Sequence, residues 1–261
     1  MIVKRLPRFL LLGLILTVLG LPGLALASQP ATSHTVPLTS TDVLSVTLSP
    51  SADNTLYEDP NGSLSNGAGA YFFAGRAGPA ANGTIRRGLI RFDVASSLPP
   101  TATIVGATLY LTMSQTIAGP QPVELHRVTA SWGAGSSAAT GSEGSGAPAA
   151  AGDATWLHRF YSSTLWTKPG GDFVATASAT TTVNGIGPYS WSAPGMVSDV
   201  RVWLDAPATN EGWLLLGNET TSSTAKRFDT KENPDPNARP LLVVTYLLLP
   251  HKTYLPIVSK Q

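Results

Sequence analysis

The chain has 261 residues, no cysteine and a nearly balanced charge, with 17 Lys and Arg against 16 Asp and Glu. These counts exclude disulfides, thiolate nucleophiles and thiolate metal sites, and they argue against nucleic acid as a partner, which requires a concentrated basic surface. Only 13% of the residues are charged, whereas Gly (25) and Pro (21) are abundant. This composition is typical of many short strands and turns.

The first 27 residues have the pattern of a secretory signal peptide. Three basic residues precede the apolar run Phe9–Leu21, and Ala25–Ala27 supplies small residues before a cleavage point at Ser28. An uncleaved anchor is the alternative, but the run is shorter than the roughly 20 residues that span a bilayer. We therefore expect cleavage, no membrane insertion afterwards, and a secreted protein that is extracellular or associated with the cell surface. Residues 28–41, rich in Ser, Thr and Pro, are predicted to be a flexible lead-in.

Short segments with strand patterns, separated by turn signals, fill residues 42–248. In Ile85–Val94 the even-numbered residues from 90 to 94 form an apolar face, and in Ile104–Met113 the odd-numbered residues from 107 to 113 do so. Pro240–Leu248 is apolar on both faces, which predicts a central strand covered on both sides. The other predicted strands are Asp42–Leu48, Asn54–Asp59, Ala70–Gly75, Val123–Thr129, Phe173–Val183, Gly212–Gly217 and Ala225–Thr230.

One segment, Met196–Leu204, has a different period. Its apolar residues 196, 200, 203 and 204 follow helical spacing after Pro194 and Gly195, which predicts one short helix packed on a sheet edge. About ten strands and one helix indicate an all-β fold, a β-sandwich with long loops.

These segments, in this order, carry a family pattern. The stretches DNTLYED, GLIRFDV, GATLYLTM, VELHRVTASW, SDVRVWL, GWLLLGNE and RFDTKENPDPNARPLLVVTY together resemble the DNRLRE domain, over residues 42–248. The resemblance implies a jelly-roll-type β-sandwich similar to carbohydrate-binding modules, in a secreted or surface protein of a prokaryote. No single stretch is chemically specific, so the resemblance indicates the family more strongly than the activity.

A run of small residues between Trp132 and Trp156 is either a linker between two domains or a loop inside one. The family pattern continues on both sides of it, so we predict a single domain in which residues 133–152 form a loop. The absence of large apolar side chains predicts that this loop is a flexible, disordered tip.

Clustered aromatic residues are the predicted ligand-binding groups: Trp156, Arg159, Tyr161 and Trp166 in one stretch, with Tyr189 and Trp191 in another. Sugars stack their C–H faces on such rings, and arginine can bond hydroxyls or a uronate. The alternative is that these rings cover the core beneath long loops, and for each ring individually that interpretation is favoured.

Acidic residues flank the first and last family segments. Asp53 with Asp229, Glu232 and Asn233 could supply the oxygens that calcium takes, so calcium is the one cofactor that we consider. The favoured alternative is solvated turn acids paired with neighbouring Lys or Arg, because the spacing matches no calcium loop.

Catalytic motifs are not visible: the sequence has no HExxH, GxSxG, P-loop or GxGxxG pattern. We therefore expect a non-catalytic monomer that binds a polysaccharide or cell-surface glycan. A structural or adhesive surface protein, bound to protein or envelope, is the second hypothesis, and an undetected glycan-active hydrolase is the third.

The tail 249–261 contains YLPIV, similar to the endings of some secreted prokaryotic proteins. The tail has two interpretations, a segment for attachment and an extra edge strand.

Overall fold

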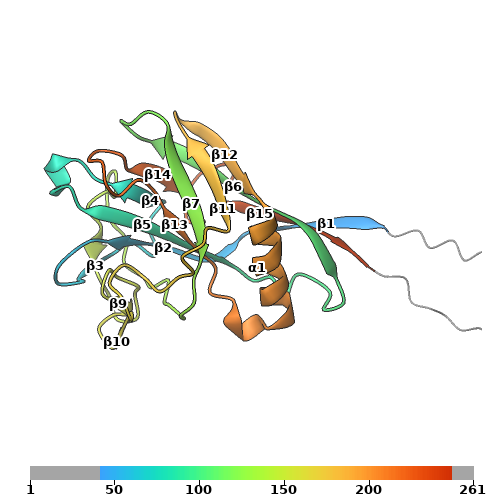
Figure 1. Cartoon of the computed structure of the whole chain (residues 1–261). Coiled ribbons are helices and arrows are strands. Elements are labelled where there is room, and N and C mark those ends of the chain that lie inside the picture. Colours follow the sequence, from blue (N-terminus) through green and yellow to red (C-terminus); the bar gives the residue numbers. More distant parts are fainter. Residues whose placement is uncertain (1–41, 249–261) are drawn as a thin grey trace, which may run out of the picture. The chain divides into compact units, whose positions relative to one another are not determined.

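The computed structural model describes residues 42–248 (Figure 1). The predicted signal peptide, lead-in and C-terminal tail lie outside the described residues. The described part is mostly β, with a single short α-helix, and within it no helix combines the length and apolarity needed to cross a bilayer. Its elements are β1 (Val43–Leu48), β2 (Pro50–Tyr57), β3 (Leu64–Ser65), β4 (Tyr71–Arg76), η1 (Pro79–Ala81), β5 (Ile85–Phe92), β6 (Thr103–Gln115), β7 (Gln121–Arg127), β8 (Ala147–Pro148), β9 (His158–Phe160), β10 (Thr164–Leu165), β11 (Ala179–Val183), β12 (Gly187–Ser192), α1 (Pro194–Asp205), η2 (Pro207–Thr209), β13 (Trp213–Leu216), β14 (Lys226–Asp229) and β15 (Leu241–Leu247).

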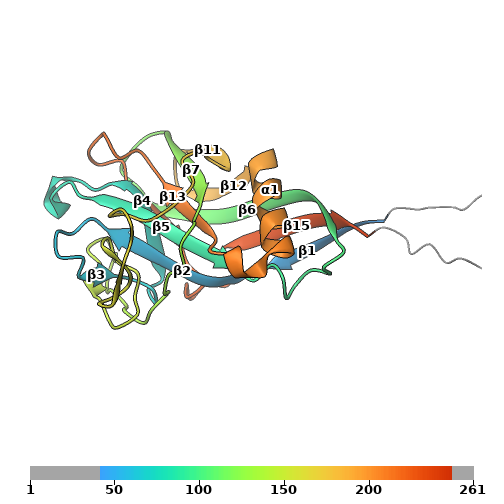
Figure 2. The same cartoon turned by 60° about the horizontal axis from the view of Figure 1, so that its bottom comes forward.

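A large antiparallel sheet of eleven strands dominates the structure. The strands follow the order β1-β15-β6-β14-β4-β5-β13-β7-β11, with β12 added beside β6 and β2 added beside β5. The sheet curls like half of a barrel, and α1 lies across one side of it (Figures 1 and 2). The all-β expectation with one helix is therefore confirmed at the level of a curled antiparallel sheet.

The main core lies inside the curl, where the apolar faces predicted from alternation meet. The even-numbered residues from 90 to 94 and the odd-numbered residues from 107 to 113 are buried there, as predicted. All four apolar positions of the predicted helix are buried in the same core. The rings of Trp203 on α1 and Trp213 on β13 meet edge to face, with centroids 4.5 Å apart, so the helix is fixed by aromatic packing as well as by burial.

The last strand, β15, differs from its prediction. It is central, since it pairs with β1 on one side and β6 on the other. Only one of its faces is covered, however: Leu242 and Val244 are buried, whereas Leu241 is 40% exposed. Although β15 has apolar residues on both faces, residues 42–248 cover only one of these faces.

A second core lies on the outward face of the sheet. The stretch 128–173 folds over β2, β5 and β13, and its Trp132, Trp156 and Trp166 pack with Leu56, Leu89 and Leu214. This cover appears below β2 in Figure 1 and beside β3 in Figure 2. The small-residue run thus belongs to a segment that covers the same sheet that the later strands complete.

Candidate ligand-binding site

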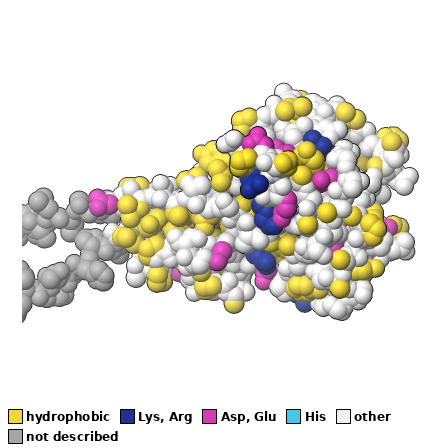
Figure 3. All heavy atoms as spheres, turned by 180° about the vertical axis from the view of Figure 1, so that it is seen from behind, with side chains coloured by type: hydrophobic (Ala, Val, Ile, Leu, Met, Phe, Trp, Pro, Cys, Tyr) yellow, Lys and Arg dark blue, Asp and Glu magenta, His cyan; other side chains and the backbone are white. Residues whose placement is uncertain are grey.

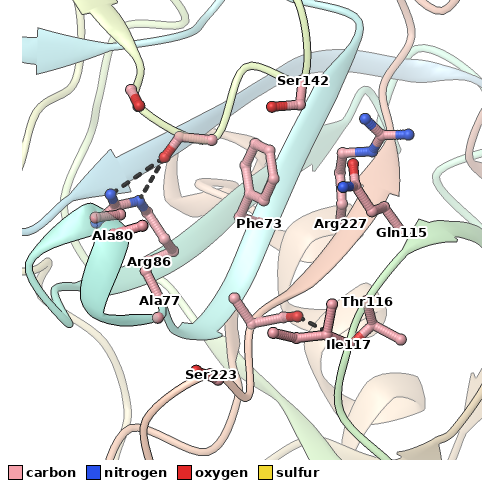
Figure 4. A pocket seen from close by; sticks show the side chains of 15 residues that line it. Phe73, Ala77, Ala80, Arg86, Gln115, Thr116, Ile117, Ser142, Ser223 and Arg227 are labelled. Carbon is pink, nitrogen blue, oxygen red and sulfur yellow. Dashed lines mark hydrogen bonds between the residues drawn. The ribbon is translucent and has the colours of Figure 1, made fainter.

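A hollow of about 400 Å³ opens beside the turn between β4 and β5 (Figure 4). We call it the hairpin pocket. Its walls come from the β4–β5 hairpin, the end of β6 and the residues after it, residues 142–145, and β14 with the residues before it. Segments that are far apart in the sequence therefore meet here.

Strand register sets the central row of the hairpin pocket. Because β14 lies between β4 and β6, Arg227 on β14 pairs with Phe73 on one side and with Gln115 on the other. Side chains directly opposite each other on adjacent strands lie on the same face of the sheet. An aromatic ring, a guanidinium and a primary amide are thereby placed next to one another, as Figure 4 shows.

Arg227 has hydrogen-bond donors that the fold does not use. Its guanidinium lies over the ring of Tyr71, with Cζ 3.7 Å from the centroid, and its Nε donates to Ser114 Oγ at 3.1 Å. Its two terminal nitrogens make no hydrogen bond or ion pair within residues 42–248. By contrast, Arg87 and Arg91 are paired with Glu219 and Glu211.

Arg86, on the opposite wall, is a positioning residue. It is 4% exposed, and its Nε and Nη2 donate to the carbonyl oxygen of Gly144 at 3.2 and 3.1 Å. Its guanidinium also lies 4.8 Å from the ring centroid of Tyr57. Burial lowers the pKa of this group from its usual range. With Nε and Nη2 directed at Gly144 and Nη1 at Thr84 and Ile85, Arg86 holds the 142–145 wall in place.

Glu143 fixes the same wall from inside the small-residue loop. Its carboxylate accepts hydrogen bonds from Asn66 Nδ2 and from the backbone N–H groups of Ala70 and Tyr71, at 2.8 to 3.1 Å. Its carbonyl oxygen accepts the hydroxyl of Tyr57 at 2.8 Å. The residue is buried and has a left-handed backbone, with φ of 62°. In the loop 133–152, which the sequence predicts to be flexible, buried polar groups bond the chain to the sheet in place of the apolar contacts that it lacks.

The aromatic stretch predicted to bind ligand lies in the second core. Trp166 and Trp156 are only 5% and 9% exposed, and Trp166 Nε1 donates to the carbonyl of Thr155. Arg159 bonds Ser131, and the ring of Tyr161 meets His158 edge to face. The structure therefore brings Trp156 and Trp166 together, but as packing groups rather than as an open platform.

Tyr189 and Trp191 lie on β12, in the other core. Trp191 is fully buried and donates through Nε1 to the carbonyl of Val123. Tyr189 packs against the main core, and its hydroxyl donates to the carbonyl of Gly185. The two predicted aromatic groups thus do not form one surface.

The predicted calcium ligands are only partly assembled. Asp53 is fully buried on β2 and accepts the backbone N–H of Lys231 at 3.0 Å, and Glu232 lies beside it. Asp229 lies at the end of β14, and Asn233 accepts a turn N–H from Asp235. Residues 42–248 contain no group of three or more His, Cys, Asp or Glu side chains arranged to hold a metal, and calcium binding by these four residues stays a prediction.

Asp53 and Glu232 nevertheless form an unusual carboxyl pair. Asp53 Oδ1 and Glu232 Oε2 are buried and have no hydrogen-bond partner within the described chain. Burial raises the pKa of Asp53 to about 8, and the neighbouring Glu232 carboxylate also raises it, while Lys231 acts in the opposite direction. A protonated Asp53 would donate to Glu232 and satisfy both oxygens.

No model of a known protein family matches the chain, and no curated protein is detectably similar to it in sequence. The site therefore has to be judged on its own geometry. Phe73, Gln115 and Arg227 were not among the residues predicted from sequence, although each lies in or next to a predicted strand. Only the register that pairs β4, β14 and β6 brings them together, and no pattern within a single segment encodes that pairing.

Proposed function

We propose that this protein is a secreted, non-catalytic module that binds a polysaccharide or another cell-surface glycan in the hairpin pocket. The observation that carries the proposal is the row of Phe73, Arg227 and Gln115 facing an open hollow. Sugars suit this row because their C–H faces pack on aromatic rings while their hydroxyls and ring oxygens accept from guanidinium and amide groups.

The chemistry of the pocket lining supports a binding role. Ser142, Ser145 and Thr116 add hydroxyls to the walls, and no carboxylate or imidazole from residues 42–248 lines the hollow. General acid–base catalysis needs such a titratable group within reach of the substrate. The resemblance to the DNRLRE domain supports the same function, and with it a jelly-roll arrangement of the curled sheet and a location outside the cell.

Affinity electrophoresis tests this function. We expect the purified protein to be retarded in gels that contain one of xylan, mannan, β-1,3-glucan, pectin or cell-wall glycan. Arg227→Gln and Gln115→Ala should each weaken binding about tenfold, the effect of losing 1.4 kcal/mol. Arg159→Gln, a change in the stretch predicted from sequence, is the matched control and should bind normally.

Two results would contradict the proposal. One is an absence of retardation by every polysaccharide of the panel. The other is normal retardation of Arg227→Gln together with loss of binding in Arg159→Gln, which would move the site to the second core.

A structural or adhesive role is the second candidate, and a different surface favours it. Large apolar side chains are exposed on β1, β6 and β15, including Val43, Tyr110 and Leu241. Tyr110 and Leu241 are paired across β6 and β15 and form one exposed apolar patch, whereas Val43 lies opposite Leu247 at the other end of β15; Figure 3 shows hydrophobic side chains exposed at several places on one face of the molecule. Such a patch suits a protein or envelope partner, and Tyr110→Ser with Leu241→Ser should then reduce attachment to cells without changing retardation by polysaccharide.

A further inference from the structure

A second hollow, of about 440 Å³, lies on the other side of the β4–β5 hairpin loop. Ala77, Gly78, Ala80 and Ala81 line the hairpin pocket, whereas residues 82–84 of the same loop line the second hollow. The remaining wall comes from residues 58–60, 156–157 and 169 and from Arg76, whose Nε and Nη1 donate to the carbonyl oxygens of Glu219 and Gly83. We call it the acidic hollow, because Glu58 and Asp59 line it.

Each of these two carboxylates has an oxygen that accepts hydrogen bonds within the fold. Glu58 Oε2 accepts the backbone N–H of Ile85 at 2.7 Å, and Asp59 Oδ2 accepts both the N–H and the hydroxyl of Ser63 at 2.8 Å. The second oxygen of Glu58 accepts no hydrogen bond from another residue of the described chain. Burial alone would raise the pKa of Asp59, but the hydrogen bonds from Ser63 and from the backbone N–H of Asn61 outweigh it and lower the pKa, so this group is an ionised acceptor.

Trp156 supplies the apolar wall of the acidic hollow, and its position is fixed. Arg87 lies 5.0 Å from its ring centroid, and Gly170 packs on the ring so closely that a Cβ there would lie 2.8 Å from it. Pro60 and Pro169 extend the wall. Rigid apolar surface beside free acceptors suits a sugar ring whose hydroxyls donate.

The β4–β5 loop separates the two hollows and carries few large side chains. Between Ala77 and Thr84 the loop consists of Ala, Gly and Pro residues apart from Asn82, so few side chains stand between the hollows. The β4–β5 loop lines both hollows, and it lies at the end of the sheet away from the start of β1 and the end of β15 (Figure 1). One extended molecule could therefore contact both.

We propose that the acidic hollow is a second subsite for the same glycan chain, which crosses the β4–β5 loop and donates hydroxyls to Glu58 and Asp59. This inference rests on the proposed function. It assigns different polar groups to the two subsites: the hairpin pocket donates through Arg227 and Gln115, and the acidic hollow accepts chiefly through its two carboxylates, because Nε and Nη1 of Arg76 are bonded to backbone carbonyls. It also predicts a preference for long chains, because a second contact on one chain adds effective concentration.

The experiment measures binding by calorimetry against β-1,4-xylan and xylo-oligosaccharides of increasing length, or the equivalent series of whichever polysaccharide retards the protein. The test variant is the double change Glu58→Gln with Asp59→Asn, which keeps the acceptors for Ile85 and Ser63. We expect it to bind long oligosaccharides about tenfold more weakly than the unchanged protein and short ones equally well. Asp205→Asn, at an exposed acid on α1, is the matched control and should change neither.

The outcomes separate this inference from the proposed function. If Arg227→Gln weakens binding but the double variant binds every length normally, the second subsite is wrong and the function stands. An affinity that does not increase with chain length would likewise overturn the second subsite and leave the function in place. If the unchanged protein binds no polysaccharide, both fail.

Discussion

The two cores of this protein are built by different means. In the main core, apolar side chains alternate along strands and meet inside the curl, so that strand pairing and burial reinforce each other. In the cover formed by residues 128–173, little regular pairing exists, and buried polar groups bond the backbone of an irregular chain. Asp153, for example, is fully buried and accepts the N–H groups of Ser136 and Ala150. The comparison teaches that an irregular segment can be fixed by hydrogen bonds where it has few apolar side chains.

The largest expected effect is in the main core. Trp213→Ala removes a fully buried ring that packs on Trp203 and Phe92 and donates to Asp199. We expect a loss of about 4 kcal/mol in the free energy of unfolding, since large-to-small changes leave a cavity. Urea denaturation measures it. Tyr110→Ala, at a ring that is 46% exposed, is the control; an equal loss in both would contradict this account of the core.

The next effect is in the cover. Glu143→Ala leaves Asn66 and the N–H groups of Ala70 and Tyr71 without their acceptor, so we expect a loss of about 3 kcal/mol. Hydrogen exchange should show faster exchange at Ala70 and Tyr71 while the amides of β6 stay protected. Faster exchange everywhere, or none, would mean that the loop is not held in this way.

A third effect depends on pH. The folded-state pKa of Asp53, about 8, exceeds its ordinary value of 3.8, so the folded chain binds this proton more tightly than the unfolded chain does. The resulting stability is complete below about pH 4 and is lost as the pH rises to about 8, by at most about 1.4 kcal/mol per pH unit.

Asp53→Asn checks this pH dependence. Asparagine can donate to Glu232 without carrying a charge, so the variant should melt at a higher temperature than the unchanged protein at pH 8 and at a similar temperature at pH 4. A difference that stays constant between these two pH values would contradict the shared proton.

Sequence reasoning succeeded where one segment carries its own pattern. The alternation of apolar residues in β5 and β6 and the helical spacing in α1 are each visible within about a dozen residues. The apolar positions predicted from these patterns are buried in the structure. It was less successful where a role depends on distant partners. Glu143 stands alone in a run of small residues, and nothing near it indicates that Asn66 and Tyr71 donate to it. Trp156 and Trp166 were predicted to bind ligand because their own segment does not show what they pack on. The leucines that they cover lie on other strands.

The pairing of β1 with β15 determines how the protein would carry a mechanical load. The strands are antiparallel and in register from Val43 opposite Leu247 to Leu48 opposite Leu242. The start of β1 and the end of β15 therefore lie side by side, at the end of the sheet away from the β4–β5 hairpin (Figure 1). Ladder hydrogen bonds lie across the strands. Tension between a glycan at the hairpin end and either of these two points would run along the strands and load many rungs together. Tension that pulls the two points apart would instead open the ladder one rung at a time, beginning at Val43.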